Sequence, residues 1–308
     1  MSLSALLIAG PTASGKSSLA LELARACNGI LVNADSMQVY VDLQVISARP
    51  GAEEMALAPH RLFGHVDGAV NYSVGLWLQD AAAALDQARA QNRMPIFVGG
   101  TGMYFKALLQ GLSQIPKVPE DLRAQVREEA RGRAPQEMHA RLAMLDPAMA
   151  ARLRPSDPQR ILRAIEVHLA TGRSLSEFQA LRPAPLLAAD ACLAVALAPA
   201  RETVDAAIDA RFDSMLAGGA LAEAAALAAR NLDPALPVMR ALAVPHLLAH
   251  LAGDLALAAA AARSKADIRA YARRQETFLR HQLPEFRRAT PEVARLVAFG
   301  QIGDGRAR

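Results

Sequence analysis

Short apolar runs alternate with amphipathic stretches in the first third of the chain. Residues 3–9, 29–35 and 95–100 are apolar runs that end in glycine or polar residues, which predicts buried strands. Residues 17–26 and 76–90 repeat apolar side chains at helical spacing, which predicts helices. Strands that alternate with helices in this way favour a parallel α/β sheet with right-handed crossovers.

The pattern changes beyond the third predicted strand. Prolines that include Pro116, Pro119, Pro147, Pro155 and Pro158 punctuate a charged, helix-rich stretch. We interpret 116–184 as a mainly helical insertion that contacts the polyanionic partner considered below. Residues 193–197 then predict a strand that returns to the sheet, with helices after it. We therefore assign 1–115 and 185–285 to an α/β catalytic core, and 286–308 to a basic, flexible tail.

One later stretch, 241–262, is strongly apolar but carries polar and proline interruptions. These are Pro245, His246, His250 and Asp254. They predict a buried or amphipathic helix rather than a membrane span. The N-terminal residues lack a positive region, which argues against a signal peptide. The two cysteines, Cys27 and Cys192, lack CxxC spacing and are compatible with a reducing cytosol, so we expect a cytoplasmic protein.

Composition and charge narrow the class of protein. The chain has 308 residues, 52% hydrophobic and 21% charged, which excludes a disordered tail or a small disulfide scaffold. Its net charge is 34 − 30 = +4, but residues 263–308 hold 11 basic and 5 acidic side chains, so this end carries +6 and the rest −2. A basic end favours a polyanionic partner, although a solvated helix face gives the same count.

A phosphate-binding motif lies between the first predicted strand and helix. It consists of Gly10, Pro11, Thr12, Ala13, Ser14, Gly15, Lys16 and Ser17, and matches G-x-x-x-x-G-K-[ST] at every position. Its backbone N–H groups and the helix N-terminus favour phosphate oxygens. We predict that Lys16 lies between phosphates and that Ser17 ligates Mg²⁺. The motif leaves the reaction open, because it suits both a kinase and an enzyme that releases diphosphate during alkyl transfer.

Polar residues follow the second and third strands, at the sheet edge where ligands bind in α/β proteins. Asp35 is placed to act as a base or to hold a metal-bound water, and Gln38 offers a donor–acceptor pair that can read a base edge. The alternative is an Asx turn at Asp35. The glycines of 99–102 let the backbone approach a ligand and leave Thr101 exposed, although a simple strand-to-helix turn has the same composition.

Several long segments in this order resemble one family. They are Gly10–Ser17, Asn33–Tyr40, Val98–Tyr104, Asp157–Arg163 with Glu166 and Gly172, Arg211–Leu216 with Gly219 and Glu223, and Tyr271–Arg280. Together they resemble the tRNA dimethylallyltransferase family, also called tRNA isopentenyltransferase or IPP transferase. The resemblance extends from about Leu6 to Arg280.

The resemblance implies an activity and a set of roles. Such enzymes have a P-loop NTPase-like core and use Mg²⁺. They transfer the prenyl group of dimethylallyl diphosphate to the exocyclic N6 amine of the adenosine 3′ of the anticodon, and release diphosphate. By motif, Asp35 matches the general base, Thr101 a residue near the leaving diphosphate, and Arg211 an arginine that holds it.

The resemblance and the basic end also suggest positions that contact tRNA. They are Asp35, Ser36, Met37, Gln38, Thr101, Arg123, Gln159, Arg160, Ile161, Leu162, Arg163, Arg274 and Arg280. An adenosine stacked in a loop must be flipped out before its amine can react. We expect a monomer that binds tRNA and dimethylallyl diphosphate and no membrane.

The chain departs from the family pattern at a few positions. Ser17 stands where Thr is common, and Phe278 where Trp is common. Residues 47–49 are Ser-Ala-Arg instead of Thr-Ala-Lys. Near Ala243 the usual Gly-Tyr pair is replaced by Val244-Pro245, which leaves the start of the tRNA-facing helix open.

Two other functions remain as alternatives at this point. An ATP-dependent small-molecule or nucleoside kinase shares the phosphate-binding motif, but does not account for 159–163 and 271–280. A non-catalytic tRNA-binding module would keep the motif without using it.

Overall fold

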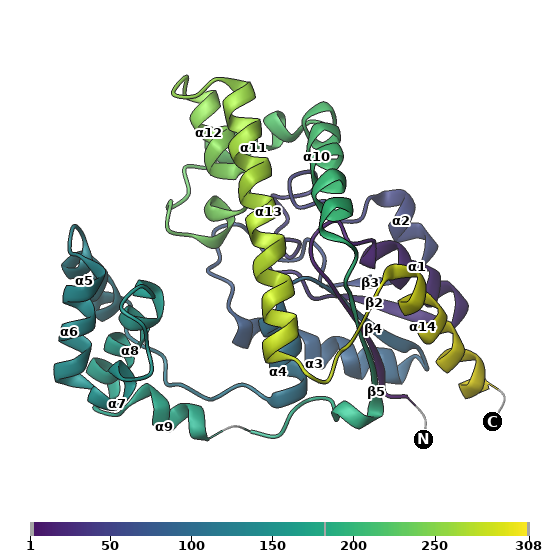
Figure 1. Cartoon of the computed structure of the whole chain (residues 1–308), viewed down its shortest axis with the longest axis horizontal. Helices are drawn as coiled ribbons and strands as arrows, with labels where there is room; N and C mark the ends of the chain where they lie inside the picture. The colour runs from purple at the N-terminus through teal and green to yellow at the C-terminus, as the bar shows by residue number, and fades with distance from the viewer. Residues whose placement is uncertain (1–2, 182, 307–308) are drawn as a thin grey trace. The chain divides into compact units, whose positions relative to one another are not determined.

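A computed structural model describes residues 3–181 and 183–306, with side chains up to 303 (Figure 1). The chain forms two compact units, and each is described by itself. Unit 1 consists of Met1–Leu109 and Leu186–Arg308, and unit 2 is Gln110–Pro185. The predicted insertion, 116–184, falls within unit 2.

Unit 1 contains one parallel sheet. Its strands are β1 (Ala5–Ala9), β2 (Gly29–Asn33), β3 (His60–Arg61), β4 (Met94–Gly99), β5 (Cys192–Leu197) and β6 (Arg287–Ala289). They lie in the order β3-β2-β4-β1-β5-β6. In the central register Leu7 pairs with Phe97 of β4 and Ile8 with Val195 of β5. Every residue of β1 and β2 is buried, which explains why these strands are apolar except for Asn33 instead of alternating.

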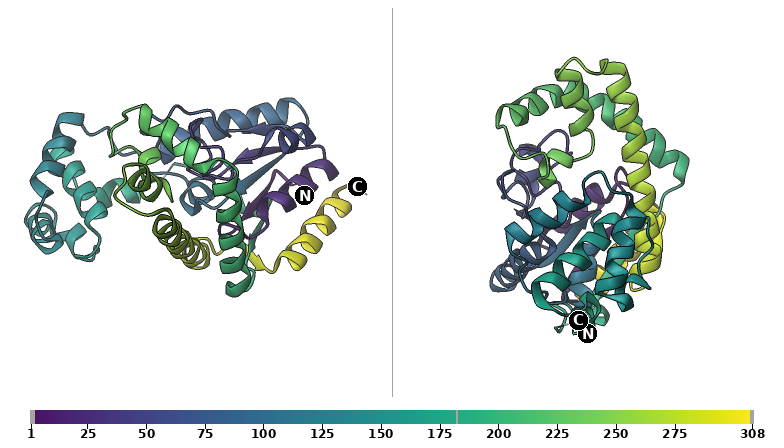
Figure 2. Two further views of the ribbon diagram at one scale, coloured as in Figure 1. Left: turned by 90° about the horizontal axis from the view of Figure 1, so that it is seen from above. Right: turned by 90° about the vertical axis from the view of Figure 1, so that its left-hand side faces the viewer.

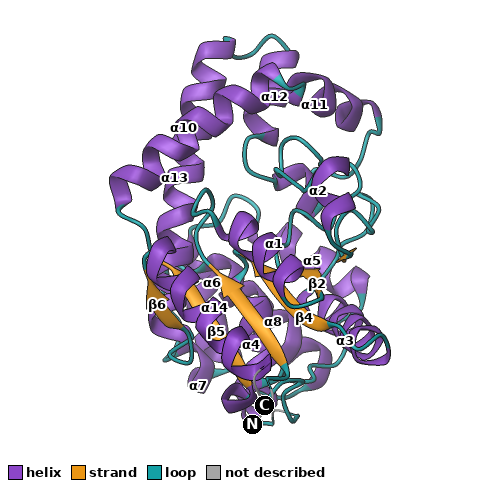
Figure 3. Ribbon diagram, turned by 90° about the vertical axis from the view of Figure 1, so that its right-hand side faces the viewer, coloured by secondary structure: helices purple, strands orange, loops and turns teal. Residues whose placement is uncertain are grey.

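Helices cover both faces of the sheet. On one face α1 (Lys16–Ala26) and α14 (Pro291–Arg306) pack side by side (Figures 2 and 3). On the other face the core takes in α3 (Val74–Ala90), α4 (Gly102–Gln110), α10 (Arg201–Ala217) and α13 (Leu257–Gln282). The remaining helices of unit 1 are α2 (Ala52–Leu57), α11 (Ala220–Ala229) and α12 (Val244–Leu251), with short 3₁₀ turns at Ala189–Ala191 and Pro237–Arg240.

The predicted strands and helices of the core are confirmed, with ends shifted by one or two residues. The two-residue strand β3 was not predicted, because its sequence is too short to show a period. Stretch 241–262 is not a single helix. It divides into α12 and α13 at Gly253, whose φ is 85°. Asp254 N–H donates to Ala249 O (2.9 Å) and Gly253 N–H to His250 O (3.0 Å), which is a Schellman ending.

The prediction of a flexible tail at 286–308 is wrong for its described part. β6 pairs in parallel with β5 and extends the sheet. α14 buries Ala294 and Ala298 against the sheet, and Arg295 donates to Glu22 of α1 (2.7 Å). Residues 286–308 carry five arginines and two acidic residues, a charge of 5 − 2 = +3 that suggested a tail, although within α14 itself the charges balance.

The start of helix α12 shows how the chain accommodates Val244-Pro245 in place of the usual Gly-Tyr pair. Pro245 lies in the first turn, where its missing N–H leaves no intrahelical bond unmade. The preceding Ala243 has a φ of 74°, a conformation that normally favours glycine. The helix therefore begins here with a proline start instead of the usual Gly-Tyr pair.

Unit 2 is a small helical bundle. Its helices are α5 (Glu120–Ala130), α6 (Pro135–Leu145), α7 (Pro147–Ala150), α8 (Pro158–Thr171) and α9 (Leu175–Ala180). Val126, Leu142 and Ile165 are fully buried in its own core. Asp157 caps α8 through the Arg160 N–H (3.3 Å), and Gly172 ends it in the left-handed conformation.

No individual helix in the described ranges is long and apolar enough to cross a membrane. Helices α10 and α11 reach that length and hydropathy only as a pair, and a bend of 64° separates them.

Candidate active site

The phosphate loop, Gly10–Ser17, joins β1 to α1. Gly15 has a φ of 85°, which allows the chain to turn into the helix at Lys16. Pro11 O accepts hydrogen bonds from Ser14 N–H (3.3 Å) and from Lys16 Nζ (3.1 Å). The buried Ser14 hydroxyl has no hydrogen-bond partner among the described residues, so it can serve a phosphate oxygen. The loop thus has the form that its sequence predicts.

Lys16 is the principal cation of the loop. Burial, opposed by the charge of Asp35 and reinforced by that of Arg211, lowers the pKa of its ammonium to about 8. A phosphate anion at this position would restore the preference for the charged form. The lysine is therefore prepared for an anionic ligand.

Ser17 follows Lys16 in the first turn of α1, and its side chain is exposed. Magnesium prefers oxygen ligands and usually keeps several waters and substrate phosphates. A single accessible hydroxyl beside a phosphate loop fits that preference. Ser17 is the side chain that would hold such an ion, and this role remains a prediction.

Asp35 lies beyond the end of β2, at the carboxyl edge of the sheet. Its N–H donates to Asn33 Oδ1 (2.8 Å), and its Oδ1 accepts from Met37 N–H (3.0 Å). The second bond is the Asx turn that was the alternative interpretation. The turn orients the carboxylate, which lines a cavity together with Thr12 and Arg211. Turn and site are therefore compatible.

Arg211 reaches the phosphate loop from α10. Its Nη2 donates to Thr12 Oγ1. Burial lowers the pKa of the guanidinium, and Asp35 opposes this shift. The structure thus brings together Lys16, Asp35 and Arg211, which lie far apart in the sequence.

Thr101 connects the ends of β2 and β4. Its Oγ1 accepts from Ser36 N–H (2.9 Å) and donates to Ser36 Oγ (3.2 Å). The side chain is partly buried and serves as a crosslink, which differs from the exposed threonine that we expected.

The glycines around Thr101 are required for a different reason from the one predicted. A Cβ at Gly99 would come within 2.1 Å of the Ala34 backbone. A Cβ at Gly100 would lie 2.0 Å from Gln275 Nε2, and one at Gly102 would lie 2.2 Å from the Phe278 ring. These positions need glycine because other parts of the protein approach closely.

Gln275 and Tyr271 of α13 complete the site. Gln275 is buried; its Oε1 accepts from Thr12 N–H (2.9 Å) and its Nε2 donates to Gly100 O (2.9 Å). Burial, followed by the charge of Asp35, raises the pKa of the Tyr271 hydroxyl, which also interacts with Thr101 and Gln275. Both residues belong to the family segment Tyr271–Arg280. Their roles could not be read from that segment, because they depend on the packing of α13 against the phosphate loop.

Gln38 does not offer the donor–acceptor pair that we predicted. Its Nε2 donates to Ser47 O (3.1 Å) and Ala48 O (2.9 Å), which uses both amide protons within the protein. Only its carbonyl oxygen could meet a base edge. Gln38 instead ties the end of β2 to the following loop.

A cavity of about 60 Å³ lies between these elements. Its polar lining consists of Thr12, Asp35, Ser47, Arg211 and Tyr271. The remaining lining is apolar, namely Met37, Leu43, Ile46, Met215, Ala241, Leu242 and Ile268. Apart from Met37, which was predicted as a tRNA contact, the sequence did not single out these apolar side chains, because they come from four separate segments and look like ordinary core residues.

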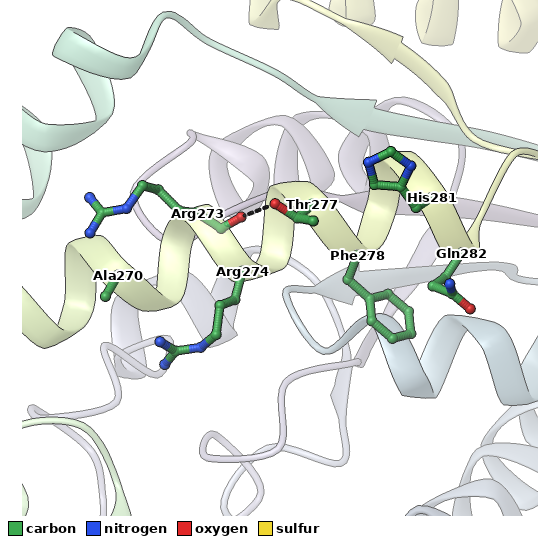
Figure 4. Close-up of a pocket in the computed structure, with 7 residues that line it drawn as sticks. All are labelled: Ala270, Arg273, Arg274, Thr277, Phe278, His281 and Gln282. Atoms are coloured by element: carbon green, nitrogen blue, oxygen red, sulfur yellow. Dashed lines mark hydrogen bonds between the residues drawn. The ribbon is translucent and has the colours of Figure 1, made fainter. Parts of the chain in front are cut away.

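A second, open cavity lies on α13 (Figure 4). It is lined by Ala270, Arg273, Arg274, Thr277, Phe278, His281 and Gln282. Arg274 and Phe278, one helical turn apart, project from the same side of the helix. Arg280 is also exposed, but it forms an ion pair with Glu276 (2.8 Å). An exposed guanidinium beside an aromatic ring suits a nucleic acid.

Unit 2 holds the remaining predicted tRNA contacts. Arg123 and Arg163 lie 3.8 and 3.5 Å from the buried carboxylate of Glu166. Gln159 and Arg160 are exposed, and Leu162 is partly buried in the unit's core. Ile161 is fully buried, so a tRNA contact through its side chain is wrong. The helical period explains this, because Ile161 faces the bundle while its neighbours face outward.

A parallel sheet whose first strand enters a glycine-lysine loop and a helix defines an α/β protein of the P-loop class. The family model described as IPP transferase matches residues 38–282, and that described as isopentenyl transferase matches residues 3–65. The chain belongs to the IPP transferase family. This confirms the resemblance and the fold inferred from its motifs.

Curated relatives and solved structures agree with this family. The chain is 62% identical over 290 residues to a tRNA dimethylallyltransferase of Beijerinckia indica, covering 94% of this chain and 96% of that one. It is 61% identical over 295 residues to the protein of the same name from Methylocella silvestris, covering 96% and 97%.

The solved structures are more distant in sequence. A full-length tRNA isopentenylpyrophosphate transferase of Bacillus halodurans is 27% identical with a TM-score of 0.68, covering 98% of this chain and 97% of that one. A eukaryotic dimethylallyltransferase described as acting on tRNA is 26% identical with a TM-score of 0.78, covering 98% and 77%.

Proposed function

We propose that this protein is a tRNA dimethylallyltransferase. It transfers the prenyl group of dimethylallyl diphosphate to the N6 amine of the adenosine 3′ of the anticodon, and releases diphosphate. The observation that carries this proposal is that Asp35 and Arg211 line one largely apolar cavity beside the phosphate loop. A base, a cationic anion site and an apolar wall are what this reaction requires.

The diphosphate end of the reaction needs positive charge. The C1–O bond of the prenyl diphosphate breaks, and diphosphate leaves with the electron pair. Lys16, Arg211 and the loop amides stabilise the charge that grows on it. A magnesium ion held at Ser17 would supply further positive charge to the same oxygens when bound.

The amine end needs a proton acceptor. An aromatic amine is a weak nucleophile, so removing its proton while the N6–C1 bond forms lowers the barrier. Oδ1 of Asp35 is engaged by Met37 N–H, which orients the carboxylate for proton acceptance by Oδ2. The apolar wall of Leu43, Ile46 and Ile268 suits a prenyl chain and limits competing hydrolysis.

The proposal extends to partners and location. We propose that Arg274 and Phe278 on α13 and the outward arginines of unit 2 bind tRNA, and that the enzyme acts as a cytoplasmic monomer. Light scattering after size-exclusion chromatography tests the oligomeric state, and cell fractionation tests the location.

The test uses purified protein with magnesium, radiolabelled dimethylallyl diphosphate and an anticodon stem-loop RNA. We expect label in the RNA, and N6-dimethylallyladenosine by mass spectrometry of its nucleosides. Parallel reactions receive γ-labelled ATP with small-molecule and nucleoside acceptors. Unchanged RNA together with phosphorylated acceptor would establish the kinase instead, and RNA binding with no transfer of either label would establish a non-catalytic module.

A further inference from the structure

Glu223, in the first turn of α11, binds three consecutive backbone amides of a distant loop. Its Oε2 accepts from Gln44 N–H (2.7 Å) and Val45 N–H (2.7 Å), and its Oε1 accepts from Ile46 N–H (2.8 Å). These amides lie nearly 180 residues away in the sequence. Three short bonds to one carboxylate form an anion-binding nest, filled here by a side chain of the same protein.

The loop that Glu223 holds belongs to the proposed active site. Leu43, Ile46 and Ser47 line the cavity that contains Asp35. Ser47 O is also one of the two carbonyls that hold the amide of Gln38. Glu223 itself does not line that cavity. Its carboxylate therefore sets the position of a cavity wall without contacting the substrate.

The chemistry of this contact requires a carboxylate. All three partners are N–H donors, so the side chain must accept at both oxygens. A glutamine of the same size accepts at one oxygen and turns an NH₂ group toward the other donors. It also loses the charge that strengthens these bonds. The loop has little regular structure of its own, and these three bonds tie it to α11.

We propose that Glu223 is a positioning residue for prenyl transfer, which it supports by holding loop 43–47 against the cavity that contains Asp35. This inference rests on the proposed function. Within the described residues, the predicted diphosphate-binding groups Thr12, Lys16 and Arg211 form no hydrogen bond to this loop. The proposal therefore separates two properties, namely geometry at the reacting carbon and affinity for diphosphate.

The experiment compares wild type, Glu223→Gln, Glu223→Asp and a matched control, Glu202→Gln. Glu202 is an exposed first-turn carboxylate on α10. For each protein, kcat and KM for RNA prenylation, the inhibition constant of inorganic diphosphate and the melting temperature are measured. We expect Glu223→Gln to lower kcat by about tenfold or more, because small misplacements in an active site cost this much. The inhibition constant should stay within twofold, and Glu202→Gln should match wild type.

Amide hydrogen exchange keeps the test independent of overall stability. In Glu223→Gln the amides of Gln44, Val45 and Ile46 should lose protection, while those of β1 and β4 keep it. Glu223→Asp retains two acceptor oxygens and should recover part of the kcat. Wild-type kcat in Glu223→Gln, or equal losses of kcat and diphosphate affinity, would overturn the inference. An inactive wild type would instead overturn the proposed function.

Discussion

The phosphate loop and the cavity wall opposite it are built in different ways. Gly10–Ser17 is one contiguous segment, and its ligand groups are chiefly backbone amides and the start of α1. The wall combines residues 37–47 with α10, α13 and residues 241–242. It is held by side chains such as Glu223, which bonds to the backbone of a segment far away in the sequence. A contiguous anion site can form from local geometry, whereas the wall exists only after distant helices have packed.

The largest expected effect separates chemistry from anion binding. Asp35→Asn keeps the size of the side chain and its turn acceptor, but removes the proton acceptor. We expect kcat to fall by about 10²–10⁴-fold, the usual contribution of a general base. Diphosphate affinity should hold or improve, because a negative charge near Lys16 is lost. Quenched-flow prenylation measures kcat, and inhibition by diphosphate measures the affinity. The exposed Asp86→Asn variant is the control. Equal losses in both would mean that Asp35 acts through the phosphate loop instead.

The second prediction concerns the junction between the two regions. Gly99→Ala places a Cβ 2.1 Å from the Ala34 backbone, so β4 and the segment that carries Asp35 must move apart. We expect the free energy of unfolding to fall by about 2–3 kcal/mol, as in overpacked cores. Urea denaturation measures this change. Gly51→Ala is the matched control, because a Cβ there meets nothing within 4 Å and should leave stability unchanged. A Gly99→Ala protein as stable as the control would show that the junction is pliable.

The third prediction uses the pH dependence of the phosphate loop. Lys16 has a lowered pKa of about 8 in the free protein, so it is charged below that pH and loses its proton above it. A bound diphosphate favours the charged form, so its dissociation constant should rise above pH 8, by up to about tenfold per pH unit. Titration calorimetry from pH 6.5 to 9.5 measures this change. The same series on Lys16→Arg, which stays charged, accounts for ionisation of diphosphate itself. Identical pH profiles for the two proteins would contradict the prediction.

The smallest effect is expected on α13. Arg274→Ala removes one exposed cation, so we expect RNA affinity to fall a few-fold and the slope of log K against log salt to decrease by roughly one. Fluorescence anisotropy at several salt concentrations measures both. Arg295→Ala on α14 removes an exposed arginine from another surface and should leave the slope unchanged. If Arg274→Ala leaves the slope unchanged, this side chain of α13 does not contact RNA phosphates.

The phosphate loop, the central strands and the family could all be predicted from the order of residues along the chain. These are local or repetitive signals: a glycine-lysine motif needs only its flanking strand and helix, and a buried parallel strand is apolar along its length. The same reasoning failed for 286–308, where basic charge concealed a strand and a helix packed on buried alanines. It also failed for Ile161, whose motif position did not reveal that it faces the core.

How the motifs work together depends on contacts that form only in the folded protein. The glycines of 99–102 are required because Ala34, Gln275 and Phe278 approach them. Gln38 donates its amide protons to carbonyls of the loop that follows it, and Glu223 of α11 accepts hydrogen bonds from backbone amides of the same loop. Such contacts have no period or spacing in the sequence. They arise when distant segments pack together, as Thr12 and Gln275 do across 263 residues, and buried polar groups find partners there.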